Sequence, residues 1–118
     1  MDIESFREYC LAKPGTEETL PFGPDTLVFK VMGKMFALTG LDNLEFKVNL
    51  KCDPDWSLEL REQHPEIQPG WHMSKKHWNT VSFEGALEES FLCELIDHSY
   101  DLVVKSLPKK TRALLDEL

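Results

Sequence analysis

The sequence has no hydrophobic segment long enough to cross a membrane. Among its 118 residues, no apolar run approaches the ~20 residues that a helix needs to span a bilayer. Residues 1–10, MDIESFREYC, carry acidic side chains where a signal peptide carries lysines, and they lack an apolar segment. We therefore expect a cytoplasmic protein with no membrane partner.

Cysteine is scarce, with Cys10, Cys52 and Cys93 widely spaced along the chain. An odd number of cysteines without a signal peptide argues against a framework of disulfides. Each of the three lies within or beside an apolar pattern, and free cysteine is among the residues most often buried. We therefore expect buried free thiols.

Motifs of the common catalytic sites are also missing. The sequence contains no GxSxG, no phosphate-binding loop and no GxGxxG. Its histidines and cysteines form no CxxC or HxxxH pair, so a structural zinc site is not expected. We expect a monomeric protein that is not an enzyme, with no cofactor and no metal.

The chain is acidic, with a formal net charge of -8. This charge argues against unselective binding to nucleic acid, because phosphate contacts dominate that affinity. The charge is unevenly distributed, however. Residues 84–101 hold six acids and no Lys or Arg, whereas residues 67–83 hold two lysines and no acid. Residues 105–112, KSLPKKTR, could meet phosphate, but we favour a role in stabilising the end of the preceding helix.

Alternation of apolar and polar residues predicts an antiparallel sheet. The clearest case is 44–52, in which Leu44, Phe46, Val48, Leu50 and Cys52 would face a core and Lys47, Asn49 and Lys51 would face water. Residues 27–32 and 35–40 flank a short turn and predict a hairpin. Residues 78–83 read as a further strand, and 66–73 as one interrupted by Pro69-Gly70 near a sheet edge.

Capping residues and helical spacing predict the helices. Asp2 would cap a first helix that ends at 13–15, and Asp53 with Pro54 would begin a second. A long amphipathic helix is expected over about 87–106, with a short helix after Pro108. The predicted fold is α+β, a two-layer sandwich in one domain, 1–118. Its antiparallel sheet would have helices on one face, in the order α-β-β-β-α-β-β-α(-α).

Several stretches resemble the MmcQ/YjbR family of small bacterial proteins. They are LPFG (20–23), FKVMGKMFAL (29–38), LKC-P (50–54), WHMSKKHWNTV (71–81) and SY-LV (99–103). The resemblance implies a fold like that of CyaY, the frataxin-like proteins and the type III secretion chaperones. It also implies DNA binding, which is often ascribed to this family, and it implies no catalytic activity or cofactor.

The stretch WHMSKKHWNTV is the strongest candidate for a binding site. It combines two tryptophans, two histidines and two lysines without an acid. In a nucleic-acid site, Lys75 and Lys76 would contact phosphates, while Trp71, His72 or His77 would stack on bases. Trp78 is a further stacking candidate. The site would include the 71–79 loop and, on the wet face of the sheet, Lys47 and Lys51.

Other interpretations of these residues remain open. Trp78 could pack in the core and Trp71 could cover the end of the sheet, while the lysines of the wet face pair with Glu45. The protein could be an interaction or chaperone-like module that binds a peptide or protein partner. A third possibility is a small-ligand pocket lined by Phe22, Trp71 and Trp78.

Overall fold

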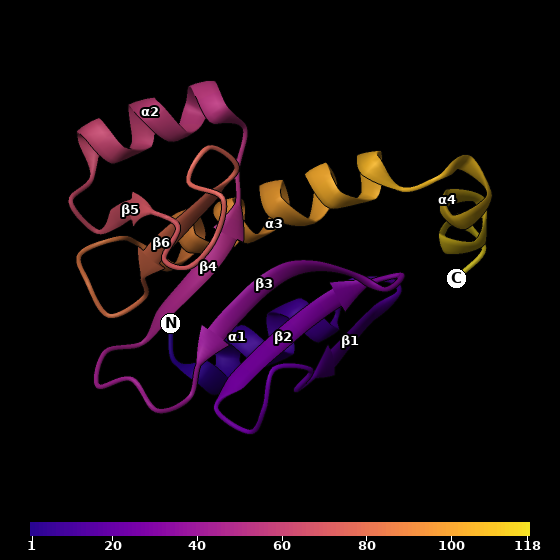
Figure 1. Cartoon of the computed structure of the whole chain (residues 1–118), viewed down its shortest axis with the longest axis horizontal. Coiled ribbons are helices and arrows are strands. Elements are labelled where there is room, and N and C mark those ends of the chain that lie inside the picture. Colours follow the sequence, from indigo (N-terminus) through magenta and orange to yellow (C-terminus); the bar gives the residue numbers. More distant parts are fainter.

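The computed structural model describes the whole chain, residues 1–118, and has two layers (Figure 1). An open antiparallel sheet has the strand order β1-β2-β3-β4-β6-β5, and helices cover one of its faces. The elements are α1 (Ile3–Leu11), β1 (Thr16–Thr19), β2 (Thr26–Val31), β3 (Lys34–Gly40), β4 (Lys47–Lys51), α2 (Pro54–Gln63), β5 (Ile67–Pro69), β6 (Trp78–Ser82), α3 (Glu89–Ser106) and α4 (Lys109–Asp116). The predicted α+β fold is confirmed, with one strand more than expected.

The additional strand is β1, which lies in a stretch that the sequence analysis left without a strand. It pairs with β2 as an edge strand, from Thr16 opposite Val31 to Thr19 opposite Val28. Its Glu18 points toward the helices and accepts a hydrogen bond of 2.6 Å from Arg7 of α1. On this strand, a charged residue faces the helices where other strands have an apolar one. The sequence of β1 therefore lacks the alternation that would have predicted a strand.

The strand predicted over 44–52 is shorter at its N-terminal end. β4 begins at Lys47, and Leu44 is fully exposed in the loop that follows β3. The backbone N–H of Leu41 donates to the carbonyl of Asp25, which extends the β2–β3 pairing one step beyond Thr26 and Gly40 before the chain leaves the sheet. The alternation is confirmed only from Phe46 onward, where Val48, Leu50 and Cys52 are buried.

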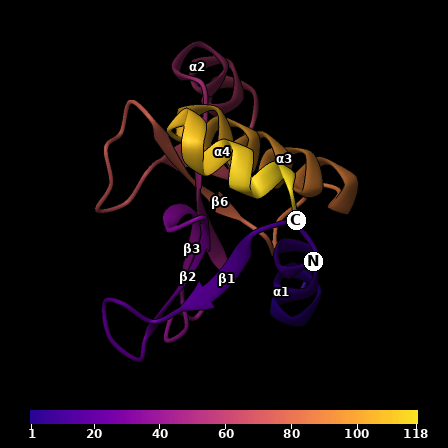
Figure 2. The same ribbon diagram turned by 90° about the vertical axis from the view of Figure 1, so that its right-hand side faces the viewer.

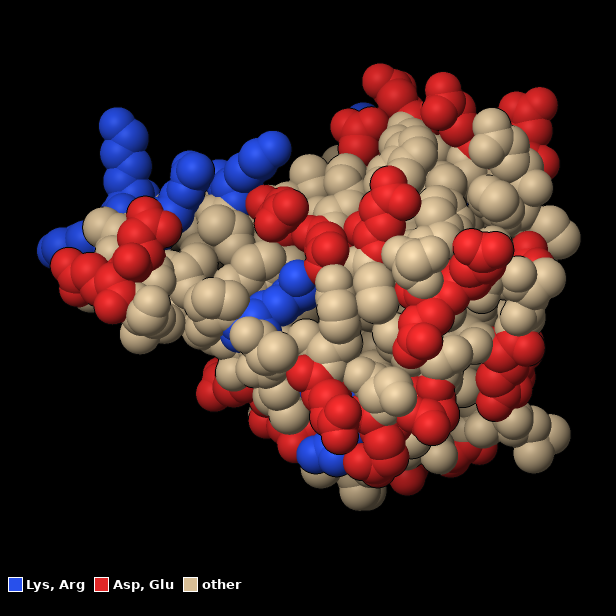
Figure 3. All heavy atoms as spheres, turned by 180° about the vertical axis from the view of Figure 1, so that it is seen from behind, with Lys and Arg blue, Asp and Glu red and all other residues tan.

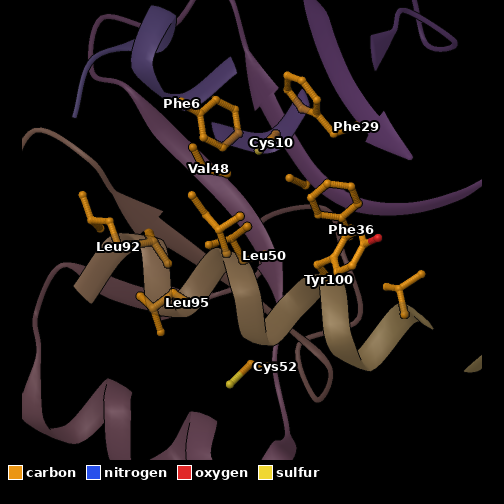
Figure 4. Close-up of a cluster of buried hydrophobic side chains, with 14 of the residues drawn as sticks. Phe6, Cys10, Phe29, Phe36, Val48, Leu50, Cys52, Leu92, Leu95 and Tyr100 are labelled. Carbon is orange, nitrogen blue, oxygen red and sulfur yellow. The ribbon is translucent and has the colours of Figure 1, made fainter. Parts of the chain in front are cut away.

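The main core lies between the sheet and helices α1 and α3. Figure 4 shows Phe6 of α1 pointing toward the strands beside Phe29 and Val48. The ring of Phe6 meets Phe29 and Phe83 edge to face, with centroids 5.2 and 5.5 Å apart. From α3, Leu92, Leu95 and Tyr100 complete the same cluster. This core leaves the opposite face of the sheet without helices.

The helices begin where their capping residues predict. The carboxylate of Asp2 accepts the N–H of Ser5, and that of Asp53 accepts the N–H groups of Asp55 and Trp56. The short terminal helix α4 projects beyond the end of the sheet (Figure 1). None of the helices has the length and apolar content needed to cross a membrane.

Candidate functional site

The face of the sheet without helices, here called the open face, carries the polar side chains of β4 and β6. Strand pairing places Lys47 opposite Ser82, Asn49 opposite Thr80 and Lys51 opposite Trp78. Two connections border this face: residues 20–25, and residues 70–77, here called loop 70–77. Figure 2 shows both projecting from the same side of the sheet, beyond the strands. The sheet and the two connections form a broad recess.

Loop 70–77 is fastened to the sheet by a small second core. Trp78 is 8% exposed and packs with Val28 and Leu38 on the open face. Met35 from β3 and Met73 from the loop are partly buried against this cluster. Of the two tryptophans in the stretch, Trp78 is therefore a packing residue, as one interpretation of the sequence predicted, and its ring is not available for stacking.

Arg61 of α2 fixes the same loop from the side. Its Nε donates to the side-chain oxygen of Asn79 at 2.8 Å. Its Nη2 donates to the backbone carbonyls of Lys75 and Trp78, at 2.5 and 3.2 Å. Sequence reasoning missed this residue, because a single arginine on a polar helix carries no signal of which distant carbonyls it will reach.

Trp71 is the exposed tryptophan of the loop, with 62% of its surface accessible. Its backbone is nevertheless held at two points. The N–H donates to Oγ1 of Thr80 at 2.8 Å, and the carbonyl accepts a longer bond of 3.4 Å from Nδ2 of Asn49. The Thr80 hydroxyl in turn donates to Oδ1 of Asn49. The backbone of Trp71 is therefore held in place on the open face, while its indole ring remains exposed.

A lysine and a carboxylate lie beside the indole. Nζ of Lys47 is 5.7 Å from the Trp71 ring centroid and 3.4 Å from Oε2 of Glu45. Oε1 of Glu45 accepts a hydrogen bond of 2.6 Å from Ser82. The hydrogen bond from Ser82, followed by that from Lys47, holds the pKa of the Glu45 carboxyl below its usual value. Lys47 thus interacts with both a ring and an acid, and one predicted ion pair is confirmed.

Two hollows meet at Trp71. The first, of about 480 Å³, lies between residues 20–25 and loop 70–77, and its apolar lining includes Phe22, Leu38 and Met73. The second, of about 670 Å³, lies toward β5 and is lined by Glu45, Glu66 and Lys75 among others. Lys47, Trp71 and Thr80 line both hollows. Each volume falls within the range of about 300–1,000 Å³ that is typical of ligand sites.

The structure brings part of the predicted site together. Lys47, Trp71 and Lys75 share the second hollow, while His72 lines the first, with its ring centroid 5.9 Å from that of Trp71. The remaining predicted residues, Lys51, Lys76 and His77, line neither hollow.

The hollows are mixed in charge. In the second hollow, Lys47 and Lys75 lie with the two carboxylates Glu45 and Glu66. The lining of the first hollow contains one acid, Asp42, and one lysine, Lys47. A ligand would therefore meet an aromatic platform in a nearly neutral setting, in which Lys47 is paired with Glu45. Such a setting favours planar, polar groups over a dense row of negative charges.

The thiols lie outside these hollows. Cys10 and Cys52 are buried, as predicted, whereas Cys93 is partly exposed. Burial raises the pKa of Cys10 to about 12 and also raises the pKa of Cys52, so both stay protonated near neutral pH. No three His, Cys, Asp or Glu side chains are grouped closely enough to hold a metal ion.

Comparison with known proteins places this architecture among related chains. The YjbR family model matches residues 11–102. Protein YjbR of Escherichia coli K12 is 36% identical over 118 residues, which cover 100% of both chains. Protein YbdF of Escherichia coli O157:H7 is 42% identical over 108 residues, 91% of this chain and 88% of that protein.

Two solved structures share the fold. The crystal structure of the Deinococcus radiodurans protein DR2400 has a TM-score of 0.90 at 40% identity, covering 97% of this chain and 87% of that one. A crystal structure of a Pseudomonas syringae protein has a TM-score of 0.74 at 30% identity, covering 86% of this chain and 98% of that one. Both therefore support the arrangement of strands and helices described above.

Proposed function

The chain belongs to the YjbR family, and we propose that it is a binding protein without catalytic activity that holds single-stranded nucleic acid on its open face. The observation that carries this proposal is Trp71, an exposed indole tied through its backbone to the sheet. We place this binding in the cytoplasm, in keeping with the sequence-based expectation.

Trp71 has the properties of a stacking platform. Stacking of a base on an exposed aromatic ring contributes about 1–3 kcal/mol and tolerates any base, because every base has a flat π-face. The two backbone hydrogen bonds of Trp71 are made before a ligand arrives, which lowers the entropy lost on binding. The first hollow offers space for the stacked base and polar groups from Asn49 and Thr80 for its edges.

The lysines would contact the phosphates on either side of that base. Lys47 and Lys75 lie at the hollow next to the indole, and Lys51 and Lys76 lie outside it, where they would extend the contact. His72 and His77 would add polar contacts or stacking at the rim. Because Glu45 pairs with Lys47, and Glu66 lines the same hollow as Lys75, stacking supplies more of the affinity than phosphate contacts do. We therefore expect weak binding with little base preference.

A titration tests the proposal directly. Fluorescence anisotropy of a labelled thymidine oligonucleotide is measured at two salt concentrations against the natural chain and Trp71→Ala. Loss of about 1–3 kcal/mol of stacking corresponds to a 5- to 150-fold weaker affinity in the variant. Leu58→Ala is the matched control, because Leu58 is 65% exposed on α2. Absence of binding at low salt, or equal affinity for Trp71→Ala, contradicts the proposal.

A protein or peptide partner is a second candidate, favoured by exposed leucines at one end of the sheet. Leu20 and Leu41 line one shallow hollow, and Leu41 and Leu44 line another. These three side chains are 45–106% exposed. If they hold a partner, Leu41→Ser with Leu44→Ser abolishes its capture after nuclease treatment and leaves oligonucleotide affinity unchanged. Capture that survives both substitutions contradicts this alternative.

A further inference from the structure

The end of α3 and the start of α4 carry four cations, Lys105, Lys109, Lys110 and Arg112, here called the basic end. All four residues are exposed. None of them takes part in the ion pairs of the structure, which join other residues. Figure 3 shows several basic side chains gathered at the projecting end of the molecule, with a few acidic ones beside them, whereas acidic side chains predominate over the rest of that face. The exposed acids of the terminal segment are Asp116 and Glu117, so the four cations outnumber them. The basic end is therefore a local exception in an acidic protein.

Helix stability accounts for only part of this cluster. Lys105 lies in the last turn of α3, where a cation interacts favourably with the helix dipole. Lys109 and Lys110 lie in the first turn of α4, where a cation opposes the dipole. That turn has no acidic residue, and no side chain caps it. These two lysines oppose the dipole of the helix that carries them, although they also follow the C-terminal end of α3, where a cation is favourable. Helix stability therefore does not account fully for their presence.

The basic end is also a fixed surface. Leu115 and Leu118 of the terminal segment approach Gly15, as does Met32 at the tip of the β2–β3 hairpin. A Cβ atom on Gly15 would lie 2.6 Å from Leu115 Cδ1 and 3.1 Å from Met32 Sδ, so the terminal segment packs closely on this residue. Its φ of 70° also favours glycine. The hairpin brings Lys34, which is exposed and also without an ion pair, to the same end.

We propose that the basic end contacts the phosphates of the same nucleic-acid strand that places a base on Trp71. This inference rests on the proposed function. At the hollows beside Trp71, Lys47 pairs with Glu45 and the ammonium group of Lys75 donates to the Gly70 carbonyl. Carboxylates equal lysines in number in each lining, so the hollows offer little net positive charge to a polyanion. The basic end supplies that charge, because its cations are exposed, close in sequence and free of carboxylate partners. The salt-dependent part of the affinity therefore comes from α4, and the stacking part comes from loop 70–77.

Strand length separates the two contacts. The longest extent of the molecule is 39 Å. An oligonucleotide of about 15 residues, at about 3.4 Å or more per phosphate, exceeds that extent, whereas one of about four residues spans only a single contact. The longer strand should bind more tightly and with a steeper dependence on salt. The shorter one should depend on Trp71 and the lysines beside it, and not on the basic end.

The test compares two variants of equal charge. The first, Lys109→Gln with Lys110→Gln and Arg112→Gln, removes three exposed cations from α4. The control, Leu58→Glu with Gln63→Glu and Ser90→Glu, changes the net charge by the same amount at exposed positions of α2 and α3. Circular dichroism checks that both variants are folded. Affinity for the two oligonucleotides is then measured over a series of salt concentrations.

For the longer strand, the slope of log affinity against log salt should fall by about 2 in the first variant, because each cation bound to a phosphate of a single strand contributes about 0.7 to that slope. The control should keep the natural slope, and affinity for the short strand should be the same in all three proteins. Equal slopes for the longer strand in the natural chain and the first variant overturn the inference, while Trp71-dependent binding of the short strand would still support the proposed function.

Other outcomes are equally decisive. If α4 governs binding of the longer strand but Trp71→Ala changes nothing, the basic end is a phosphate contact and the proposed stacking site is wrong. The cations could instead meet the acidic face of a second copy. Sedimentation velocity would then show a salt-sensitive dimer that the first variant abolishes, with unchanged affinity for the longer strand, and this result also overturns the inference.

Discussion

The ammonium group of Lys47 lies 5.7 Å from the Trp71 ring centroid and 3.4 Å from the Glu45 carboxylate, so one cation interacts with both a ring and an acid. The carboxylate partly neutralises a charge that would otherwise face a ligand stacked on the indole. The Lys47 side chain is itself only partly exposed, with 39% of its surface accessible. In the proposed function, Glu45 would therefore adjust binding at Trp71 without touching the stacked base.

Replacement of Glu45 should strengthen binding of single strands. Glu45→Gln removes the negative charge and keeps an oxygen that can accept the hydrogen bond from Ser82. Lys47 is then free to bind a phosphate, and the salt slope should steepen by about 0.7. Glu59→Gln, at an exposed position on α2, makes the same change in net charge and controls for it. Equal affinities for the two variants would show that Lys47 does not reach the ligand.

Removal of the Thr80 hydroxyl should loosen the Trp71 platform. Thr80→Val deletes the acceptor for the Trp71 N–H and the donor to Asn49 in a buried position. The loss of buried hydrogen bonds should cost about 1–3 kcal/mol of unfolding free energy. Amide exchange at Trp71 should accelerate and oligonucleotide affinity should fall. Thr80→Ser keeps the hydroxyl, so this variant should behave much like the natural chain; unchanged exchange in Thr80→Val would contradict the prediction.

Arg61 should be important for stability because it donates hydrogen bonds to backbone carbonyls in and next to loop 70–77. Arg61→Met retains an apolar stem of similar length and removes every hydrogen bond to Asn79, Lys75 and Trp78. We expect a loss of about 1–3 kcal/mol in urea unfolding. Arg61→Lys should recover only part of it, because an ammonium group cannot match the planar guanidinium fork. A loss below about 0.5 kcal/mol, the scale of ordinary surface substitutions, would show that the loop is held by packing alone.

His98 should make the protein less stable in mild acid. Its Nε2 accepts the N–H of Asp53 at 3.0 Å, and its ring meets Trp56 edge to face. Burial lowers the pKa of His98 below its ordinary value of 6.5, so near that pH the unfolded chain binds a proton more readily than the folded chain does. The contribution to stability is complete above pH 6.5 and is lost as pH falls through and below that value.

Urea unfolding at a series of pH values between about 7.5 and about 5.5 measures this loss. His98→Gln should be less stable at the upper end of this range and should show a weaker dependence on pH within it. The carboxyls of Glu18 and Glu45, whose pKa values are lowered by their partners, lose their contributions only at pH values below their ordinary 4.5. A slope that is the same in His98→Gln and the natural chain would assign the effect to another group.

Local sequence patterns predicted most of the fold. The caps Asp2 and Asp53 depend on nearby backbone groups, and both helices begin beside them. The alternation from Phe46 to Cys52 likewise produced the central strand. β1 escaped prediction, because its place in the sheet depends on pairing with β2 and on an ion pair between Glu18 and Arg7. Neither contact leaves a local periodic signal.

By itself, the sequence determined that residues 71–79 are unusual, and that the sheet has one apolar face and one polar face, because residue type and a period of two are local properties. Only the tertiary structure decided which tryptophan is available. Trp78 and Trp71 belong to the same stretch, yet the loop folds back over Trp78 and leaves Trp71 outside. Burial depends on segments distant in sequence, here Val28, Leu38 and Arg61, and no pattern within the stretch encodes their positions.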